Sequence, residues 1–99
     1  MPQFDIHRLK NGRGFVLDCQ ADILDNLPTR FVVPMVEAGP VPELALRFSP
    51  GFVVAGEKMR MATNIAATVA RTELGEVVAS LAEESHRVIG AIDVLITGV

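Results

Sequence analysis

The 99-residue chain contains no tryptophan and no tyrosine, and its aromatic side chains are five phenylalanines. Proteins that bind single-stranded nucleic acid stack bases on aromatic rings, and this composition supplies few of them. Nine basic residues against twelve acidic ones give a formal charge of −3, and the basic residues are spread along the chain. A domain whose binding rests on phosphate contacts concentrates its positive charge. Both shortages argue against nucleic acid as the main ligand.

Cysteine and histidine are also scarce. Cys19 is the single cysteine, so no disulfide can form within the chain, which indicates a reducing compartment. It lies in the apolar run 15–19, where a buried structural thiol is expected. His7 and His86 are the only histidines; we expect both to face solvent, and they have no zinc-ligand spacing. We therefore predict no catalytic residues, no metal site and no cofactor.

Acidic residues cluster at Asp18, Asp22 and Asp25. They could bind a cation, but aspartates in loops commonly accept hydrogen bonds from nearby backbone amides. Such Asx turns explain the cluster more simply. Glu83 and Glu84 are favoured at a helix start by the helix dipole, so we do not interpret them as an acid–base pair.

Long apolar runs are absent as well. Hydrophobic residues make up 49% of the chain, yet no stretch approaches the ~20 uncharged residues of a membrane-spanning helix. The first residues lack the basic start and apolar run of a signal peptide. We therefore expect a cytoplasmic protein that does not associate with membranes. A length of 99 residues fits one domain over 1–99.

Short strands joined by turns are predicted over residues 1–79. Apolar and polar side chains alternate from Phe4 to Leu9, which is the period of a half-buried strand. The pair Asn11-Gly12 favours a tight turn, and an apolar segment follows. Together these features predict a hairpin over residues 4–19.

Further strands follow a predicted loop at 20–29. Residues 30–36 are rich in strand formers, but Pro34 cannot donate a backbone hydrogen bond, so we expect this strand at a sheet edge or bent there. The apolar segment 52–55 is expected to be a strand covered on both faces, with another strand over 59–63. Four or five short strands at this spacing predict a small barrel or curled sheet.

The last third of the chain changes character. Ser80-Leu81-Ala82-Glu83 has the form of a capping box, and apolar side chains then recur at helical spacing as far as Val99. These features predict a helix over about 81–97. A strand is the alternative, because the region is rich in β-branched residues and contains Gly90. An apolar stripe that reaches the last residue either docks in the chain's own core or is offered to a partner.

Four segments carry, in order, the patterns of one known family. Residues 17–25 are similar to V-D-x-Q-x-D-I-[IL]-[DE], and residues 29–35 to R-x-V-[VI]-P-L. Residues 56–63 are similar to a turn followed by [WY]-R-M-x-T, with Met59 at the aromatic position, and residues 91–99 to A-I-[ND]-x-[LI]-x-x-G-[IV]. The chain thereby resembles the CcdB family of plasmid-maintenance and chromosomal toxins over nearly its whole length.

The resemblance implies both a fold and a function. The fold is mainly β with one C-terminal helix: a small SH3-like β-barrel or curled antiparallel sheet of the kind found in CcdB and MazF toxins, forming a symmetric homodimer. The function is that of a toxin that binds the DNA gyrase A subunit and traps its complex with cleaved DNA. An antitoxin neutralises such a toxin, and the two together repress their operon by binding operator DNA. Such an inhibitor is not an enzyme.

The resemblance also implies target-binding residues, while those that bind the antitoxin stay unassigned. Thr97 stands where the best-studied branch of the family has a tryptophan that stacks in the target's pocket. A CcdB-like dimer that still binds an antitoxin, with its target lost or changed, is therefore an alternative. The implied gyrase-binding residues are Ile23, Leu24, Ile96, Thr97, Gly98 and Val99.

An RNA-cutting toxin of the same fold is the second alternative. Such toxins use an arginine with a nearby acid–base residue. Arg8, Arg13, His7 and Asp18 would form such a set if the hairpin brought them together. No spacing in the sequence requires this arrangement, and the negative net charge argues against it.

Overall fold

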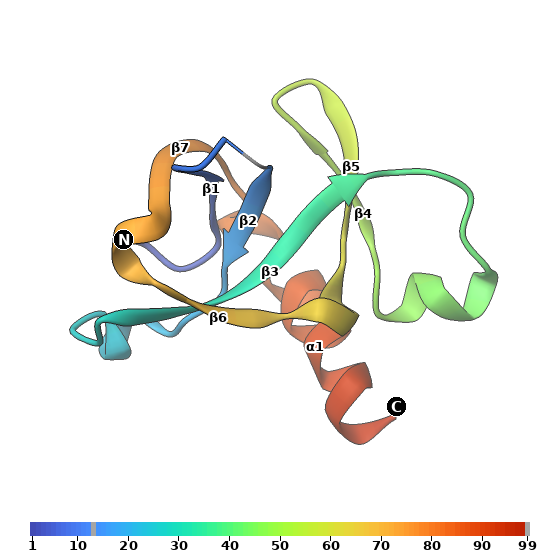
Figure 1. Cartoon of the computed structure of the whole chain (residues 1–99). Helices are drawn as coiled ribbons and strands as arrows, with labels where there is room; N and C mark the ends of the chain where they lie inside the picture. Colours follow the sequence, from blue (N-terminus) through green and yellow to red (C-terminus); the bar gives the residue numbers. More distant parts are fainter. Residues whose placement is uncertain (13, 99) are drawn as a thin grey trace.

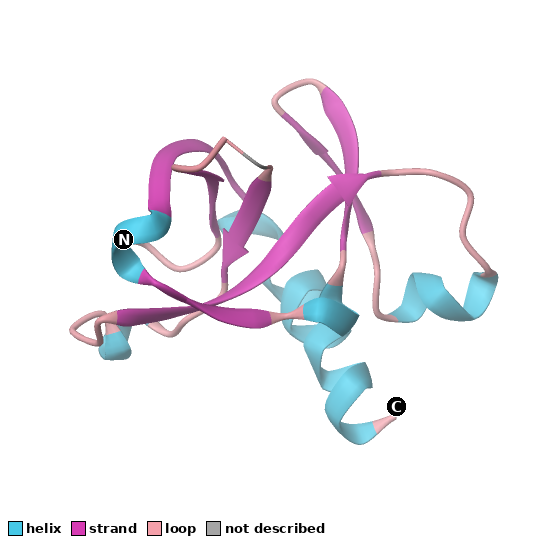
Figure 2. Cartoon of the chain, viewed as in Figure 1, coloured by secondary structure: helices cyan, strands magenta, loops and turns pink. Residues whose placement is uncertain are grey.

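Residues 1–12 and 14–98 are described by a computed structural model of the chain, which contains seven strands, five short 3-10 helices and one α-helix in that part (Figure 1, Figure 2). The strands are β1 (Asp5–Leu9), β2 (Phe15–Asp18), β3 (Thr29–Glu37), β4 (Gly51–Val54), β5 (Glu57–Met61), β6 (Ala67–Ala70) and β7 (Leu74–Ser80). The 3-10 helices are η1 (Asp22–Leu24), η2 (Glu43–Arg47), η3 (Thr63–Ile65), η4 (Arg71–Glu73) and η5 (Ala82–Glu84), and the α-helix is α1 (Ser85–Thr97). Arg13 and Val99 lie outside the described residues.

The strands form one curled antiparallel sheet with α1 packed against it (Figure 1). The strand order is β4-β5-β3-β2-β1-β7, and β6 pairs with β3 beside this path. β1 pairs with β7 in a register that sets Asp5 opposite Ser80, so segments distant in the sequence are neighbours in the sheet. The predicted fold class, a mainly β curled sheet with one C-terminal helix, is confirmed.

The first hairpin is also confirmed. β1 and β2 pair antiparallel with Ile6 opposite Leu17, and the turn between them contains Gly12 with a φ of 76°. The Gly12 amide donates to the Leu9 carbonyl at 2.9 Å. A glycine suits this position because it adopts positive φ without steric cost.

The edge position expected for the strand of Pro34 is wrong, because β3 lies inside the sheet with partners on both sides. β3 pairs with β2 on one side, and on its other side with β6 up to Val32 and with β5 from Met35 onward. The Pro34 carbonyl accepts from the Ala62 amide at 2.8 Å on that second side. The backbone amide and carbonyl of one residue face the same side of a strand. A backbone N–H at position 34 would therefore point to the side on which β3 changes its partner from β6 to β5. No ladder hydrogen bond is lost there.

The expectation for residues 52–55 was wrong. β4 is an edge strand that pairs only with β5, and its side chains alternate between buried and exposed. Val53 is 69% exposed, whereas Phe52 and Val54 are buried. The apolar sequence therefore does not reflect burial on both faces. The Ala55-Gly56 turn, with φ values of 51° and 83°, joins β4 to β5 in a tight hairpin.

β6 and β7 are not among the strands predicted from the sequence. β6 consists of small and β-branched residues, Ala67-Thr68-Val69-Ala70, and it pairs with the start of β3 far back along the chain. Strand pairing over such a separation leaves no local turn signal in the sequence. The structure therefore has more strands than the four or five expected.

The C-terminal segment is a helix, and the alternative of a strand is wrong. Val88 and Ala91 are buried on the face that packs against the sheet. The capping box does not form, because the Ser80 hydroxyl accepts from the Ala82 amide at 3.2 Å and starts η5, while α1 begins only at Ser85. In the part of the chain that the structure describes, no helix is both long and apolar enough to cross a membrane.

The two histidines differ in exposure. His86 is exposed on α1 as expected, but the prediction for His7 was wrong, because its side chain is only 2% exposed. Its Nδ1 lies 3.1 Å from the Gly75 carbonyl and donates to it, while Nε2 is buried with no partner among the described residues. A Cβ at Gly75 would lie 2.6 Å from the Arg8 carbonyl, so β1 and β7 approach this closely only with glycine there.

Cys19 is buried, which confirms the structural role expected of it. Its thiol is removed from water and lies near the negative charge of Asp18. Burial first, and that charge second, raise the pKa of the Cys19 thiol to about 12. The reactive thiolate is therefore scarce at neutral pH.

A buried ion pair joins β2 to β3. Arg30 and Asp18 both have fully buried side chains, and Arg30 donates to one Asp18 oxygen from Nε at 3.0 Å and from Nη2 at 2.7 Å. The other Asp18 oxygen accepts from the Gln20 amide at 3.1 Å, which is the Asx turn expected for this residue. Arg30 also donates to Asp25 at 2.8 Å and to the Met1 carbonyl at 3.3 Å. Each buried charge therefore has partners.

Replacing Arg30 by methionine should lower the free energy of unfolding by about 3–5 kcal/mol, because Asp18 would stay buried without its counter-charge. Urea unfolding measures this change. Arg47→Met is the matched control: Arg47 is exposed, so its loss should change stability by no more than about 0.5 kcal/mol. Equal effects of the two substitutions would contradict a structural role for the buried pair.

Candidate target-binding surface

The end of α1 leaves the body of the protein. After Ala91 the helix runs past the sheet, and Figure 1 shows its last turns projecting from the molecule. Leu95 and Ile96 are 45% and 76% exposed, and Thr97 and Gly98 are also exposed. We call these four residues the helix-end surface. These residues face solvent and do not pack into the hydrophobic core.

The last turn of the helix is held in one shape. The Thr97 hydroxyl donates to the Asp93 carbonyl at 2.8 Å, and the Gly98 amide donates to the Val94 carbonyl at 2.9 Å. Gly98 has a φ of 75°, the left-handed conformation that commonly ends a helix and that glycine adopts most readily. The Ile96 side chain therefore projects from an ordered turn, which limits the entropy that binding would remove.

The second predicted element lies on η1. Ile23 is 89% exposed and Leu24 is 48% exposed, and we call this pair the turn surface. Gln20 fixes the turn from beneath, because its side chain donates to the Leu24 carbonyl at 2.8 Å and accepts from the Phe31 amide at 3.0 Å. The hydrogen bonds of Gln20, which the sequence did not predict, thus fix the turn that exposes these two apolar side chains to solvent.

Asp25 connects this turn to the rest of the fold. Its carboxylate lies 2.8 Å from Arg30, 3.5 Å from the N-terminal ammonium of Met1 and 3.7 Å from Arg71. Burial acts to raise the pKa of the Asp25 carboxyl, but the ammonium, the Arg30 hydrogen bond and Arg71 outweigh it and lower that pKa below its usual range. Asp22 accepts from the Gln3 amide at 2.8 Å.

The three aspartates thus serve protein donors. Within residues 1–12 and 14–98, no three side chains of the His, Cys, Asp or Glu type converge in a way that could hold a metal ion. The positive charges at Arg30 and Arg71 come from residues distant in the sequence, and for that reason spacing alone could not reveal them.

The turn surface and the helix-end surface do not meet within one chain. Figure 1 shows η1 beside the start of β3, at the opposite side of the molecule from the C-terminus. Each surface carries exposed apolar side chains: Ile23 and Leu24 on the turn surface, and Leu95 and Ile96 on the helix-end surface. A single small pocket on a target could not receive both from the same chain.

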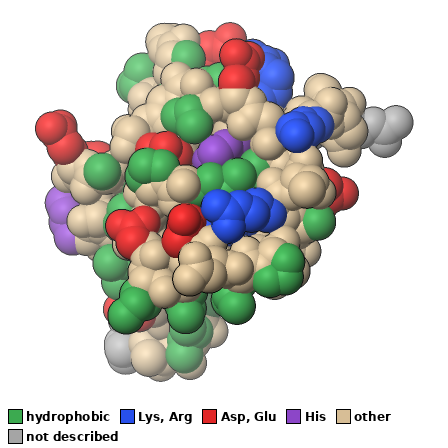
Figure 3. Space-filling view, turned by 90° about the vertical axis from the view of Figure 1, so that its left-hand side faces the viewer, with side chains coloured by type: hydrophobic (Ala, Val, Ile, Leu, Met, Phe, Trp, Pro, Cys, Tyr) green, Lys and Arg blue, Asp and Glu red, His purple; other side chains and the backbone are tan. Residues whose placement is uncertain are grey.

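The residues proposed for RNA cleavage are not assembled either. Asp18 is buried against Arg30, and His7 is buried with Nδ1 engaged by Gly75. Arg8 is exposed and lies 3.1 Å from Glu76, with its guanidinium 4.9 Å from the centre of the Phe15 ring. Arg13 falls outside the described residues. Figure 3 shows one face of the molecule, on which basic side chains are mixed with acidic and apolar ones and form no continuous basic groove.

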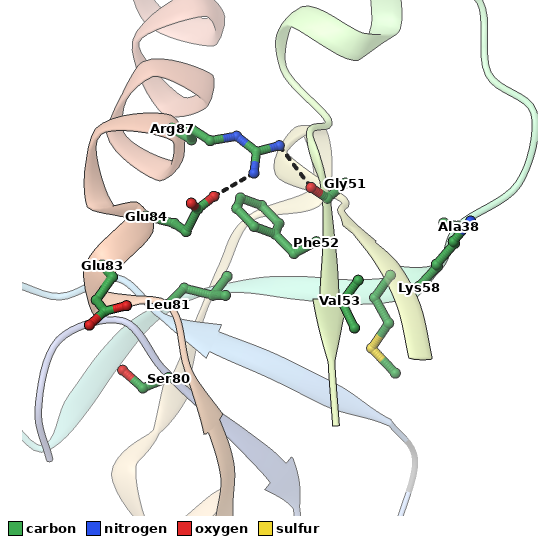
Figure 4. Close-up of a pocket in the computed structure, with 11 residues that line it drawn as sticks. Ala38, Gly51, Phe52, Val53, Lys58, Ser80, Leu81, Glu83, Glu84 and Arg87 are labelled. Carbon is green, nitrogen blue, oxygen red and sulfur yellow. Dashed lines mark hydrogen bonds and ion pairs between the residues drawn. The ribbon is translucent and has the colours of Figure 1, made fainter. Parts of the chain in front are cut away.

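A further groove, not predicted from the sequence, lies between β4 and the start of α1. It has a volume of about 530 Å³, and Phe52 and Leu81 form its apolar floor. Arg87 places its guanidinium 4.3 Å from the centre of the Phe52 ring, donates to the Gly51 carbonyl at 2.8 Å and pairs with Glu84 (Figure 4). We call this the β4–α1 groove.

The curled sheet and its C-terminal helix have the same fold as several solved toxin structures. An endoribonuclease in complex with its cognate antitoxin, from a mycobacterial species, has a TM-score of 0.74 and 12% identity, over 97% of this chain and 95% of that one. The Mycobacterium tuberculosis toxin MazF-mt6 has a TM-score of 0.67 and 20% identity, over 89% and 91%. A further toxin, named Mtb toxin, has a TM-score of 0.67 and 18% identity, over 89% and 96%. At these identities the likeness concerns the fold.

The sequence itself decides the family. Residues 3–98 match the family described as CcdB protein. The chain therefore belongs to the CcdB family, as its four motifs suggested. No curated protein matches it.

Replacing Asp25 by asparagine should make stability less dependent on acid pH. A carboxyl whose pKa is lowered by folding stabilises the protein above its unfolded pKa of about 3.9 and loses that contribution as the pH falls below it. The thermal midpoint of the wild type should therefore fall as the pH is lowered from about 4 towards 2, and that of Asp25→Asn should fall less. Asp93→Asn, at an exposed aspartate on α1, is the control and should keep the wild-type slope. Identical slopes in all three proteins would contradict the role given to Asp25.

Proposed function

We propose that this chain is the toxin of a toxin–antitoxin pair and that it binds the A subunit of DNA gyrase through the helix-end surface. Membership of the CcdB family supports the toxin role. The observation that carries the choice of surface is Ile96, which is 76% exposed on an ordered turn at the end of the chain. Ile96 lies beside Leu95, which is 45% exposed, and neighbouring exposed apolar side chains are typical of protein–protein interaction sites.

The proposed mechanism is binding without chemistry. The toxin inserts Ile96 and its neighbours into gyrase while the enzyme holds cleaved DNA, and the bound toxin opposes religation. The turn surface of Ile23 and Leu24 makes a second contact, and it does so from the other subunit of a toxin homodimer, because one chain holds the two surfaces apart. Exposed Ile65 and Ile89 supply apolar area for the dimer. The toxin needs no metal, cofactor or catalytic residue for this action.

An antitoxin completes the proposal. It binds the toxin in the cytoplasm, removes it from gyrase and, together with the toxin, binds operator DNA. The toxin alone carries a formal charge of −3, so the antitoxin supplies the basic DNA-binding part. The fold shared with an endoribonuclease solved beside its cognate antitoxin supports a partner of this class.

Purified gyrase tests the proposal directly. The toxin, gyrase and supercoiled DNA are incubated, the reaction is stopped with detergent, and linear DNA bound to the A subunit is measured. The wild-type chain should cause it to accumulate. Ile96→Asp should reduce this effect by about 30-fold or more, because a charge replaces an anchor. Leu44→Asp is the matched control: Leu44 is 70% exposed on η2, outside both surfaces, and its replacement should leave trapping unchanged.

The variant Thr97→Trp tests whether the tryptophan found at this position in the best-studied branch of the family strengthens binding to gyrase. A tryptophan at an interface centre contributes roughly 2–4 kcal/mol, so the variant should trap gyrase at a concentration about 30-fold or more lower. A wild type that is inert and a Thr97→Trp variant that poisons gyrase would instead favour a CcdB-like dimer that has lost its target. If both are inert, gyrase is not the target.

RNA cleavage is the competing activity, favoured by the fold shared with an endoribonuclease. It is tested by incubating RNA with excess toxin. We expect the RNA to stay intact, because Asp18 is buried and already paired with Arg30. Cleavage that persists in purified Ile96→Asp would overturn the gyrase proposal and assign the function to RNA.

A further inference from the structure

The connection between β3 and β4 forms an arm that stands away from the sheet. It comprises residues 39–50, which we call the η2 arm, and Figure 1 shows it projecting from the body of the molecule. Leu44 and Leu46 on η2 are 70% and 51% exposed. Long connections that leave the body of a domain are often functional, and neighbouring apolar side chains held in water commonly mark a binding surface.

The η2 arm is ordered at its root and along η2. Ser49 is 1% exposed, and its hydroxyl donates to the Met61 carbonyl at 2.5 Å and accepts from Arg60 at 3.0 Å. On η2 itself, the Ala45 amide donates to the Pro42 carbonyl at 2.9 Å. The arm therefore presents its side chains from a fixed backbone, which limits the entropy that binding would remove.

One row of side chains on η2 joins an apolar group to a positive charge. Residues three apart are aligned on a 3-10 helix, so Leu44 and Arg47 lie on the same row. Arg47 is exposed and takes part in none of the ion pairs found among the described residues. Glu43, the acidic residue of η2, starts a different row about 120° away around the helix. The row of Leu44 thus offers apolar contact together with an unpaired cation.

The β4–α1 groove offers the complement of this row. Its floor of Phe52 and Leu81 is apolar, and its volume of about 530 Å³ is within the range of binding sites. On the α1 wall, Glu84 is already paired with Arg87. Glu83 lines the same wall, is exposed and takes part in no ion pair within the described part of the chain. Its carboxylate is therefore available to a cation.

The other charges near the groove also favour a cation. Lys58 lines the groove from β5, and it shares an adjoining hollow with Glu37 and Glu57. Apart from the ion pair on α1, the groove and this hollow thus carry the three carboxylates of Glu37, Glu57 and Glu83 and one ammonium, that of Lys58. A segment that is apolar and positively charged fits these surroundings better than an acidic one.

The arm does not fill the groove of its own chain. None of residues 39–50, all of which the structure describes, lines the groove. Ala38 and Gly51, which flank the arm in the sequence, do line it, so arm and groove lie side by side on one surface. A surface that carries a projection beside the hollow that fits it is self-complementary. A two-fold contact between identical chains requires this property.

We propose that the η2 arm of one copy inserts into the β4–α1 groove of a second copy, and that the second arm does the same in return, with Leu44 over the apolar floor and Arg47 against Glu83. This contact uses neither the helix-end surface nor the turn surface, and it does not depend on the proposed function. Because the inserted row is small, the association is weak and disappears in dilute protein.

Charge reversal tests the pairing of Arg47 with Glu83. Sedimentation equilibrium over about a 100-fold range of concentration gives the weight-average mass, which should rise with concentration for the wild type. Arg47→Glu and Glu83→Arg should each weaken association about 5- to 10-fold, because like charges then meet twice in each pair of chains. Lys10→Glu is the matched control: it changes the net charge as Arg47→Glu does, at an exposed residue outside arm and groove, and should stay within about 3-fold of the wild type.

Mixing the two reversed variants shows whether arm and groove come from different chains. In a mixed pair, each arm meets a groove of opposite charge. An equimolar mixture of Arg47→Glu and Glu83→Arg should therefore associate within about 3-fold of the wild type, although neither variant does so alone. A mixture that associates no better than its two components would refute the exchange of arms.

NMR on the wild type maps the contact without any substitution. The backbone amide signals of Leu44 and Leu81 should shift as the protein concentration is raised, while that of Ile96 should stay in place. Shifts confined to Ile65 and Ile89 would assign self-association to the dimer surface of the proposed function and overturn the contact between arm and groove. A mass that does not change with concentration would also overturn it. Neither result bears on gyrase trapping, which is measured separately.

Discussion

The ion pair between Arg30 and Asp18 is the constraint on which much of this fold depends. A guanidinium with no exposure to water must be satisfied from all sides, and here its partners come from β2, from the loop after η1 and from the first residue of the chain. Buried ion pairs contribute modest net stability and are sensitive to the loss of one partner. Their contribution here is to geometry. The pair sets how β2 meets β3 and where the loop carrying Ile23 and Leu24 is held.

Several polar and charged side chains of this protein are buried, and several large apolar side chains are exposed. Charged and polar groups are buried and paired near η1, while large apolar side chains are exposed on η1, on the end of α1 and on β4. Each exposed apolar group is positioned by polar contacts close to it: Gln20 beneath Leu24, the Thr97 hydroxyl beside Ile96, and Arg87 at the edge of β4. Apolar contact area with little freedom of movement loses less entropy on binding, which suits the proposed function.

The features that could be predicted from the sequence are those with local causes. Alternation and an Asn-Gly turn identify the first hairpin, helical spacing identifies α1, and ordered motifs identify the family. The wrong predictions share one cause: the burial and strand pairing of a residue depend on segments that are distant in the sequence. Pro34 is central because β3 changes partners beside it, the apolar residues of β4 reach an open edge, and His7 is covered by β7. The exposure of Ile96 was predictable, whereas the separation of the turn surface from the helix-end surface required the topology.

The pairing of β1 with β7 has a consequence for how this protein is made. Asp5 lies opposite Ser80, so β1 cannot pair with β7 until the ribosome has synthesised the whole segment between these two residues. Pairings between such distant segments form slowly, on the order of milliseconds to seconds. Because α1 packs against this sheet, the helix end that carries Ile96 becomes ordered only after β1 and β7 have paired. Under the proposed function, this late ordering of the helix end leaves time for an antitoxin to bind the toxin before gyrase does.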